Sequence, residues 1–450
     1  MRTHALSWCA GVLAVWLGMP LASYAESPPP YPLGRGLPAF EAPAEPRESA
    51  SVPIADPRGD LTLDAALAAA LLGNANLAAD AYEVRAREAA LLQAHARPNP
   101  TLALELEDFA GSGEFRGARS AQTTLLLGQL VELGGKRAAR VRTADADLEA
   151  AAWDYELRRI DVLARTAGAF AAVLTAQERL RLADESVALA KETQRVAGLR
   201  MRAGIASAAE EIRAGVSVEI AAVEREHTEH ELETARQTLA SMWGGEEARF
   251  ERAQGDLEVL PEVPSEDSLA LRLGEAPGVA RWQAERARRD AQLAQARSAR
   301  APDLTLHAGP RHLSGPGNTA LVAGVSLPLP LWDRRRGAIA EAAQRAAKGA
   351  AEARAERVRA ATEIATARVG LAAAAEEAEL LRTRVIPGAE RAVAALRDGY
   401  QRGRFALVEV LEAERARLDA RTQHLNALAE AHRHARELER LTGAPLEVRS

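Results

Sequence analysis

The sequence predicts a mainly α-helical, duplicated fold with a small β-sheet portion, and three observations support this prediction. Residues 62–243 and 266–442 follow the same order: an apolar helix, a proline, an alternating strand, a glycine-rich tip, a second strand, a basic turn, a very long helix, a glycine and a shorter helix. Matching motifs recur about 200 residues apart, which indicates a repeated unit. The chain is 27% charged, only 4% aromatic and rich in alanine, a composition typical of long, closely packed helices.

Three pairs of motifs define the repeat, with offsets of 302 − 100 = 202, 331 − 133 = 198 and 403 − 204 = 199 residues. They are Pro100-Thr-Leu-Ala-Leu104 with Pro302-Asp-Leu-Thr-Leu306, Leu133-Gly-Gly-Lys-Arg137 with Leu331-Trp-Asp-Arg-Arg335, and Gly204 with Gly403. We therefore divide the chain into a signal peptide (1–25), a Pro-rich segment (26–60), a first repeat (61–243), a linker (244–265), a second repeat (266–443) and a tail (444–450).

The N-terminus has the features of a cleavable export signal. Arg2 and His4 precede an apolar stretch that ends near Met19, and Ser23-Tyr-Ala25 offers small residues at the cleavage-site positions. The stretch is too short for a bilayer-spanning helix. The only cysteine, Cys9, lies inside it and outside a lipoprotein motif, so we expect no lipid anchor and no cysteine in the mature chain. Residues 26–60, rich in proline, are expected to be extended and poorly ordered.

The first repeat opens with a helix expected from Thr62, as N-cap, to about Arg97, where Pro98 and Pro100 end it. Alternating leucines then predict a strand over about 101–109, and a return strand over 120–133 follows the glycine-rich tip. Ten residues is the length that a tilted strand needs to cross a bilayer.

A very long helix from residue 136 to about 197 is predicted next, roughly 100 Å in length. Its apolar residues follow the heptad spacing of a coiled coil: Ile160, Leu163, Ala167, Phe170, Leu174, Leu182, Leu189 and Val196. Gly204 breaks this helix. Ser207 and Glu210 have the spacing of a capping box that would open the next helix, which runs to about Trp243.

The second repeat predicts a helix over 266–300, strands over 303–309 and 319–329, and a long helix that Asp333 caps. Pro387 is expected to kink this helix, and Gly403 to break it. The last helix carries its apolar stripe on Leu411, Leu418 and Leu425 and ends at Gly443. In each half, two stacked short helices would match the length of one long helix, which predicts a long antiparallel pair.

Four strands cannot close a barrel, and open strand edges are not tolerated in lipid. Two copies would supply eight strands, the smallest barrel, with a lumen filled by side chains. Three copies would supply twelve, enough for an open pore. An exported chain with bilayer-length strands and 100 Å helices therefore predicts a tube that is anchored in an outer membrane and crosses the periplasm.

Motifs in order along residues 60–443 resemble the TolC-like outer membrane efflux proteins, and most resemble the CzcC-type channels of heavy-metal pumps. The motifs are Asn99-Pro-Thr-Leu102, Gln129-Leu-Val-Glu-Leu-Gly-Gly-Lys-Arg137, Tyr400-Gln-Arg-Gly403 and Leu407-Val-Glu-Val-Leu-Glu-Ala413. The resemblance implies a homotrimer in the outer membrane of a Gram-negative bacterium, with a twelve-stranded barrel continued by an α-helical barrel. It also implies a periplasmic adaptor, an inner-membrane RND pump and outer-membrane lipid as partners.

The resemblance further implies that the turns after the two long helices close the periplasmic end and dock the adaptor. The residues concerned are Arg202, Gly204, Ile205 and Ser207 in the first turn, and Arg402, Gly403, Arg404 and Phe405 in the second. Arg404 and Phe405 replace the small or aliphatic pair that is usual in the family.

The resemblance places acidic rings on Glu409 and Glu412, just beyond the second turn, with Glu210 at the equivalent place in the first repeat. Glu409 and Glu412 are three residues apart and so share a helix face. Carboxylates crowded by threefold symmetry would attract cations and form a gate. The alternative is that Glu210 is only a capping residue and that the other two belong to a solvated face.

The sequence contains few features that would support other classes of function. The net charge of −6 argues against nucleic-acid binding, and no catalytic triad, phosphate loop or cofactor motif occurs, so we expect no enzyme and no cofactor. Two histidine pairs, His432 with His434 and His227 with His230, lack the cysteines or carboxylates of a metal site, so we expect no metal site. His307 and His312 flank an extracellular tip and are expected to be solvated. The alternatives to metal export are a channel for drugs or type I secreted polypeptides, or a periplasmic coiled-coil adaptor or scaffold.

Overall fold

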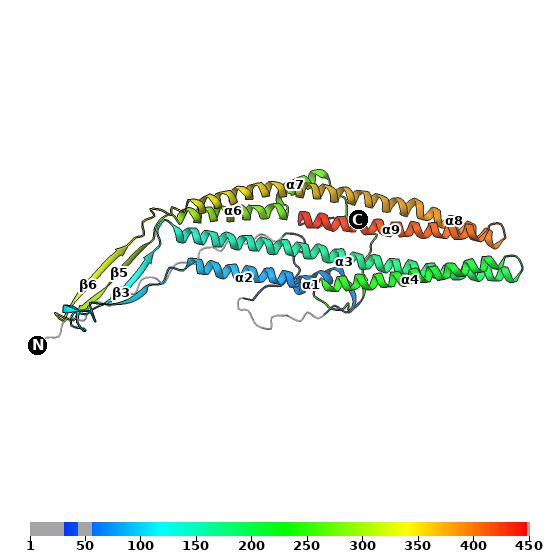
Figure 1. The fold of residues 1–450 in the computed structure, drawn as a ribbon. Coiled ribbons are helices and arrows are strands. Elements are labelled where there is room, and N and C mark those ends of the chain that lie inside the picture. Colours follow the sequence, from blue (N-terminus) through cyan, green and yellow to red (C-terminus); the bar gives the residue numbers. More distant parts are fainter. Residues whose placement is uncertain (1–30, 44–55, 448–450) are drawn as a thin grey trace.

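The computed structural model describes residues 31–43 and 56–447 and has an elongated shape, with a four-stranded sheet at one end and long helices extending from it (Figure 1). The chain is mainly helical, as the sequence predicts. The expected signal peptide (1–25) and the last three residues of the tail lie outside the described residues. Within the described ranges, no helix is both long enough and apolar enough to cross a membrane.

The helices of the first repeat are α1 (Leu63–Gly73), α2 (Ala75–His95), α3 (Lys136–Arg202) and α4 (Ala208–Ser241). Helix α3 has 67 residues and is therefore about 100 Å long. Helices α2 and α4 lie one after the other along α3, as Figure 1 shows. Most of the predicted heptad positions of α3 are buried, although Leu189 and Val196 are only half-buried.

The second repeat contains α5 (Glu266–Arg272), a short 3₁₀ turn (Leu273–Glu275), α6 (Pro277–Ser298), α7 (Arg336–Leu380), a π turn (Leu381–Val385), α8 (Ile386–Gln401) and α9 (Leu407–Thr442). The π turn lies just before Pro387, where the sequence predicts a kink. Proline lacks an N–H and its ring clashes with the preceding turn, which explains the local widening. The offset between the two repeats is 198 residues at the basic turn before this helix and 199 at the glycine after it. The second long helix therefore contains one residue more than the first, and a π turn accommodates one such extra residue.

The sheet consists of β2 (Thr101–Glu107), β3 (Gln122–Val131), β5 (Leu304–Leu313) and β6 (Asn318–Ser326), with a short 3₁₀ turn (Gly113–Phe115) in the first hairpin. All neighbours are antiparallel and the order is β2-β3-β5-β6, so each repeat contributes one hairpin. Within the described residues, the outer edges of β2 and β6 pair with no further strand.

Both helices that were expected to be continuous before the strands are interrupted. Thr62 caps α1 as predicted, and its hydroxyl accepts a hydrogen bond from the Ala65 N–H at 3.3 Å. Asn74 then ends α1, because its side chain accepts hydrogen bonds from the N–H groups of Asn76 and Leu77 and so starts α2. The expected helix over 266–300 likewise divides into α5 and α6, and Pro277 occupies the first turn of α6.

Two of the predicted helix caps are wrong. Ser207 stands at the N-cap of α4, but its side chain makes no capping hydrogen bond, so the expected capping box with Glu210 does not form. Asp333 accepts a hydrogen bond from the Arg335 N–H at 2.9 Å, whereas α7 has its N-cap at Arg335. Asp333 therefore stabilises the turn that precedes the helix rather than the helix terminus.

Residues 31–43 and 56–60 of the Pro-rich segment are packed rather than loose, which corrects the expectation of a poorly ordered segment for these residues. The Tyr31 N–H donates to Glu156 at 2.9 Å, and the Leu33 N–H donates to the Gly443 carbonyl at 3.1 Å. Strand β1 (Gly59–Thr62) pairs in parallel with β4 (Phe250–Gln254), which lies within the expected linker. Composition favoured an extended, poorly ordered segment, but long-range hydrogen bonds to α3 and to the C-cap of α9 hold Tyr31 and Leu33 in place.

The largest apolar core among the described residues lies where β1 packs against α1 and β4 packs against α3. Phe250 is fully buried there and packs edge-on against Trp243, with ring centroids 6.3 Å apart. Leu239 and Val173 complete this core from α4 and α3. The expected stripe of α9 is displaced: Leu411, Leu418 and Leu425 are half-buried, while Val410, Leu428 and Leu438 are buried.

Candidate functional site

Two tight turns lie together at the end of the helices farthest from the sheet (Figure 1). One joins α3 to α4 and the other joins α8 to α9. Gly204 and Gly403 adopt left-handed backbone conformations, with φ of +72° and +74°. A residue with a Cβ adopts this conformation only at a cost, which explains the glycines that the repeat places at both helix ends.

Tyr400 of α8 joins the two turns. Its side chain is only 3% exposed, and its hydroxyl donates a hydrogen bond to Glu210 of α4 at 3.3 Å. The Arg200 guanidinium stacks on the Tyr400 ring, 4.3 Å from the centroid, and donates to the Tyr400 carbonyl. Burial, followed by the nearby charge of Glu210, raises the pKa of Tyr400. Contacts from both repeats therefore hold the end of the molecule together.

The predicted docking residues form an exposed rim around these contacts. Ile205 is 65% exposed at the first turn, and Arg202 and Ser207 are exposed beside it. In the second turn the Phe405 ring lies against Gly399, where there is no room for a Cβ. Arg402 pairs with Asp398 at 2.9 Å, and the Arg404 N–H donates to the Gly399 carbonyl at 2.8 Å.

The three predicted gate carboxylates have different surroundings. Glu409 accepts a hydrogen bond from the Ala406 N–H at 2.9 Å, so it caps the first turn of α9. Glu210 is half-buried and accepts the Tyr400 hydroxyl. Glu412 is exposed. Within one chain, the equivalent capping role is therefore performed by Glu409, and Glu412 is an exposed carboxylate for which no side-chain contact is seen among the described residues.

Sequence reasoning missed a buried acidic residue, Glu414, two positions after Glu412 and on another face of α9. The Glu414 side chain is largely buried and accepts hydrogen bonds from Arg397 of α8 at 2.9 Å and from Thr193 of α3 at 3.4 Å. Burial raises the pKa of Glu414, and the Arg397 guanidinium opposes this shift. These contacts link α3, the long helix of the first repeat, to α8 and α9, the two helices that the second turn joins. The heptad pattern gave no signal for them, because Glu414 occupies a seam position normally filled by an apolar residue.

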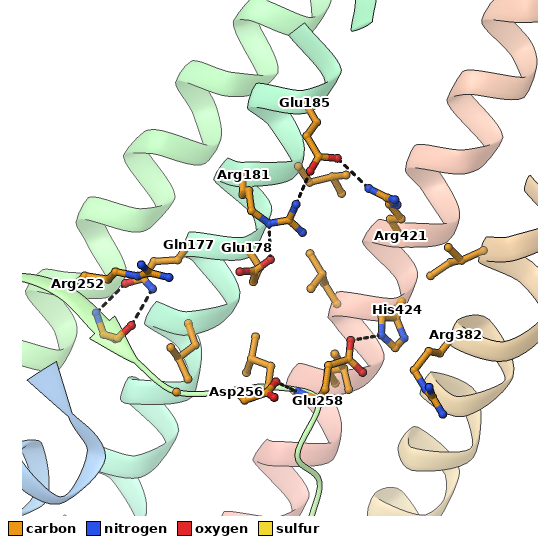
Figure 2. A pocket seen from close by; sticks show the side chains of 18 residues that line it. Gln177, Glu178, Arg181, Glu185, Arg252, Asp256, Glu258, Arg382, Arg421 and His424 are labelled. Carbon is orange, nitrogen blue, oxygen red and sulfur yellow. Dashed lines mark hydrogen bonds and ion pairs between the residues drawn. The ribbon is translucent and has the colours of Figure 1, made fainter. Parts of the chain in front are cut away.

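A cavity of about 520 Å³ lies midway along the helices, beside the π turn (Figure 2). Glu185 of α3 lies between Arg181 and Arg421, and Arg421 reaches Glu390 of α8 at 2.5 Å. His424 Nε2 lies 2.8 Å from Glu258 Oε1. These contacts connect α3, α8, α9 and the linker at the level of the π turn.

Among the described residues, several histidines have other partners, and none belongs to a group that could hold a metal ion. His432 is buried and its Nε2 lies 2.9 Å from the Leu257 carbonyl, and burial lowers its pKa. The pKa of His434 is lowered by burial and then by Arg433. His227 pairs with Glu231 at 3.3 Å. In residues 31–43 and 56–447, no group of three or more histidine, cysteine, aspartate or glutamate side chains is arranged to hold a metal ion.

Strand hairpins at one end and helical turns at the other, one of each from both repeats, define a class of duplicated, elongated proteins. The chain belongs to the outer membrane efflux protein family, whose model matches residues 66–245 and 269–444. It is 34% identical over 401 residues to the cobalt-zinc-cadmium resistance protein CzcC of Cupriavidus metallidurans, covering 89% of this chain and 92% of that protein. It is 30% identical over 284 residues to the nickel-cobalt-cadmium resistance protein NccC of Alcaligenes xylosoxydans xylosoxydans, covering 62% of each.

Solved structures support the same fold. The outer membrane protein VceC of Vibrio cholerae matches with a TM-score of 0.70 at 20% identity, covering 86% of this chain and 97% of VceC. The channel-forming protein CusC matches with a TM-score of 0.72 at 17% identity, covering 91% of this chain and 99% of CusC. The family is one of outer-membrane transport proteins, which agrees with the expectations of an outer-membrane location and of a transport protein rather than an enzyme.

Proposed function

We propose that this protein is the outer-membrane duct of a tripartite RND-type efflux system and that its cargo is heavy-metal cations. The observation that carries the proposal is the 34% identity to CzcC along nearly the whole of both chains. One further relative is named for nickel, cobalt and cadmium resistance, and another is named for nickel and cobalt resistance. A passive duct, energised by a separate inner-membrane pump and joined to it by a periplasmic adaptor, fits a chain without a nucleotide-binding motif.

Complementation tests this function. The protein would be expressed in a strain of Cupriavidus metallidurans that lacks CzcC but keeps the rest of that system. Restored tolerance to cobalt, zinc and cadmium is the expected result. Restored tolerance to organic drugs without metals, or secretion of a polypeptide in a type I system, would favour the alternative cargoes instead. A periplasmic adaptor or scaffold gains no support from the family match.

Three copies would close the sheet into a twelve-stranded barrel, with a helical barrel continuing below it. The unpaired edges of β2 and β6 support this proposal, because exposed backbone N–H and carbonyl groups are not tolerated in lipid. Every residue of β2 is exposed in the single chain, including Leu102, Leu104 and Leu106. Pairing of β2 with β6 of a neighbouring copy would satisfy both edges.

The adaptor would dock on the exposed rim of the two turns, around Ile205 and Phe405. The apolar side chains of this rim are exposed, although buried contacts hold the backbone of the two turns in place. Exposed apolar groups on a fixed backbone suit recognition by another protein. An Ile205→Asp variant is expected to insert in the membrane normally but to lose binding to the purified adaptor. Unchanged adaptor affinity would contradict this location.

The acidic gate would consist mainly of Glu412, with Glu409 contributing less because it caps α9. Three copies would bring three Glu412 carboxylates to the narrow end and favour cations there. Single-channel recording should show a larger loss of cation preference in Glu412→Gln than in Glu409→Gln. Full cation preference in the Glu409→Gln/Glu412→Gln double variant would exclude an acidic gate at these positions.

A further inference from the structure

The two turns that lead from strand to long helix differ in how their charges are neutralised. In the first turn, between β3 and α3, carboxylates of the same chain neutralise two of the three basic side chains. Lys136 pairs with Asp303 at 2.7 Å, and Arg140 pairs with Glu132 at 2.5 Å. Asp303 also accepts the Leu133 N–H, and Arg137 donates to the His95 carbonyl. Each of these basic side chains therefore has a partner in the protein.

The second turn, between β6 and α7, is open to its surroundings. Residues 331–338 are all exposed, and Trp332 is 92% exposed beside Leu329 and Leu331. Arg334 and Arg336 form no ion pair with any described residue, while Asp333 is engaged by the Arg335 N–H and lies 3.8 Å from its guanidinium. An exposed indole and two free guanidinium groups therefore share one short segment.

The internal repeat indicates what a neighbouring copy would place beside this turn. We assume that β6 pairs with β2 of the next copy in the same register as β3 pairs with β5. The residue of the next copy that then corresponds to Asp303 at the first turn is Thr101. The position of Glu132 falls on Pro330 of the same chain. Neither carboxylate of the first turn therefore has an acidic counterpart at the second turn, because the neighbouring copy would supply Thr101 and the chain itself supplies Pro330, and the basic charge of the second turn remains available.

The location and chemistry of this segment fit a lipid headgroup. The segment lies at the helical end of the sheet, opposite the hairpin tips, which is the periplasmic boundary of an outer-membrane sheet (Figure 1). Indole rings prefer the interface between hydrocarbon and water, and guanidinium groups bind phosphate through paired hydrogen bonds. We propose that Trp332, Arg334 and Arg336 bind the phosphate of an anionic glycerophospholipid in the periplasmic leaflet. The proposal rests on the hairpins lying in the outer membrane.

Fluorescence quenching tests where Trp332 lies. The purified channel would be reconstituted in phosphatidylethanolamine vesicles that contain phosphatidylglycerol, with bromine on the acyl chains of one lipid at a time. The Trp332 signal is the difference between the protein and Trp332→Phe. We expect stronger quenching by brominated phosphatidylglycerol than by an equal amount of brominated phosphatidylethanolamine. Quenching by neither lipid would mean that protein covers Trp332, and equal quenching would mean no headgroup selectivity; either result overturns the proposal.

Charge variants test the phosphate contact. Each arginine near an anionic surface contributes about 1 kcal/mol, or about a fivefold preference, so Arg334→Gln/Arg336→Gln should lose most of the phosphatidylglycerol preference. The matched control is Arg354→Gln/Arg357→Gln, which removes two exposed arginines farther along the same helix and should retain the preference. Equal preference in both variants would overturn the proposal. A protein that fails to enter vesicles at all would instead contradict the membrane location of the hairpins.

Discussion

In the first repeat, α3 buries Glu156 and Arg159 against residues 31–33, whereas the matching positions of α7, Arg354 and Arg357, are exposed. The same contrast occurs at the strand-to-helix turns, where carboxylates of the chain neutralise two basic side chains of the first turn and the second turn is open. Two copies of one pattern have thus acquired different surroundings. The first repeat obtains its partners within the chain, and the second leaves charge and apolar surface for other molecules.

The largest difference is expected for the buried ion pair. Glu156 and Arg159 are 2.7 Å apart with side chains almost fully buried, and Arg159 also donates to the Leu33 carbonyl at 2.9 Å. Removing one partner of such a pair costs about 3–5 kcal/mol, because the other charge stays buried. Arg159→Ala should therefore lower the free energy of unfolding by that amount in urea. Arg357→Ala should change it by less than about 0.5 kcal/mol. Equal effects would remove this contrast between the repeats.

The ion pairs of the first turn are expected to have a smaller effect. Asp303 is partly exposed and binds both Lys136 and the Leu133 N–H, so Asp303→Ala should destabilise by about 1 kcal/mol. Arg334→Ala at the second turn should leave the free energy of unfolding nearly unchanged. Urea unfolding of the two variants makes the comparison. A larger loss for Arg334→Ala would mean that the second turn has a partner within the protein.

Acidification should weaken the contact of α9 with the linker. The folded-state pKa of His432 lies below its ordinary value of 6.5, because burial disfavours the charged ring, so the unfolded chain binds the proton first. Stability should therefore fall as the pH drops below about 6.5. Arg436 and Asp256 near the ring act in opposite directions. The matching position of α4, Glu233, is exposed. His432→Gln should reduce the fall in melting temperature on acidification, and an unchanged pH profile would assign it to other groups.

The smallest expected difference concerns the caps of α4 and α9. Glu409 accepts the Ala406 N–H, so Glu409→Gln should cost at most about 0.5–1 kcal/mol. Ser207 stands at the matching helix start without a capping hydrogen bond, and Ser207→Ala should be nearly neutral. Thermal unfolding of both variants compares them. A clear loss for Ser207→Ala alone would reverse the assignment of the caps.

The long-range architecture could be predicted from the sequence because its signals are periodic and repeated. The length of α3, the break at Gly204 and the alternation in β2 follow from local patterns. Asn74 could not be found in this way, because a single side chain that caps α2 interrupts an otherwise helical pattern. Strands β1 and β4 are short and pair across about 190 residues, so neither has a strong signal of its own.

The candidate site could be predicted only in part, because some of its contacts have no local sequence pattern. Glycine positions located both turns, since they require a left-handed backbone. The capping role was expected for Glu210 because Ser207 completes the usual motif, whereas Ala406 before Glu409 has no hydroxyl and gave no signal. Tyr400 appeared only as part of a family motif. Its contacts with Arg200 and Glu210 join segments about 200 residues apart, which no local pattern specifies.

The mass of the assembly extracted from outer membranes tests the central claim, that separate copies complete the four-stranded sheet. Native mass spectrometry of the processed protein in detergent should give three times the mass of one mature chain, with no monomer at equilibrium. A monomer that stays in solution without detergent would contradict the account, because β2 and β6 would then keep unpaired edges and no duct could form.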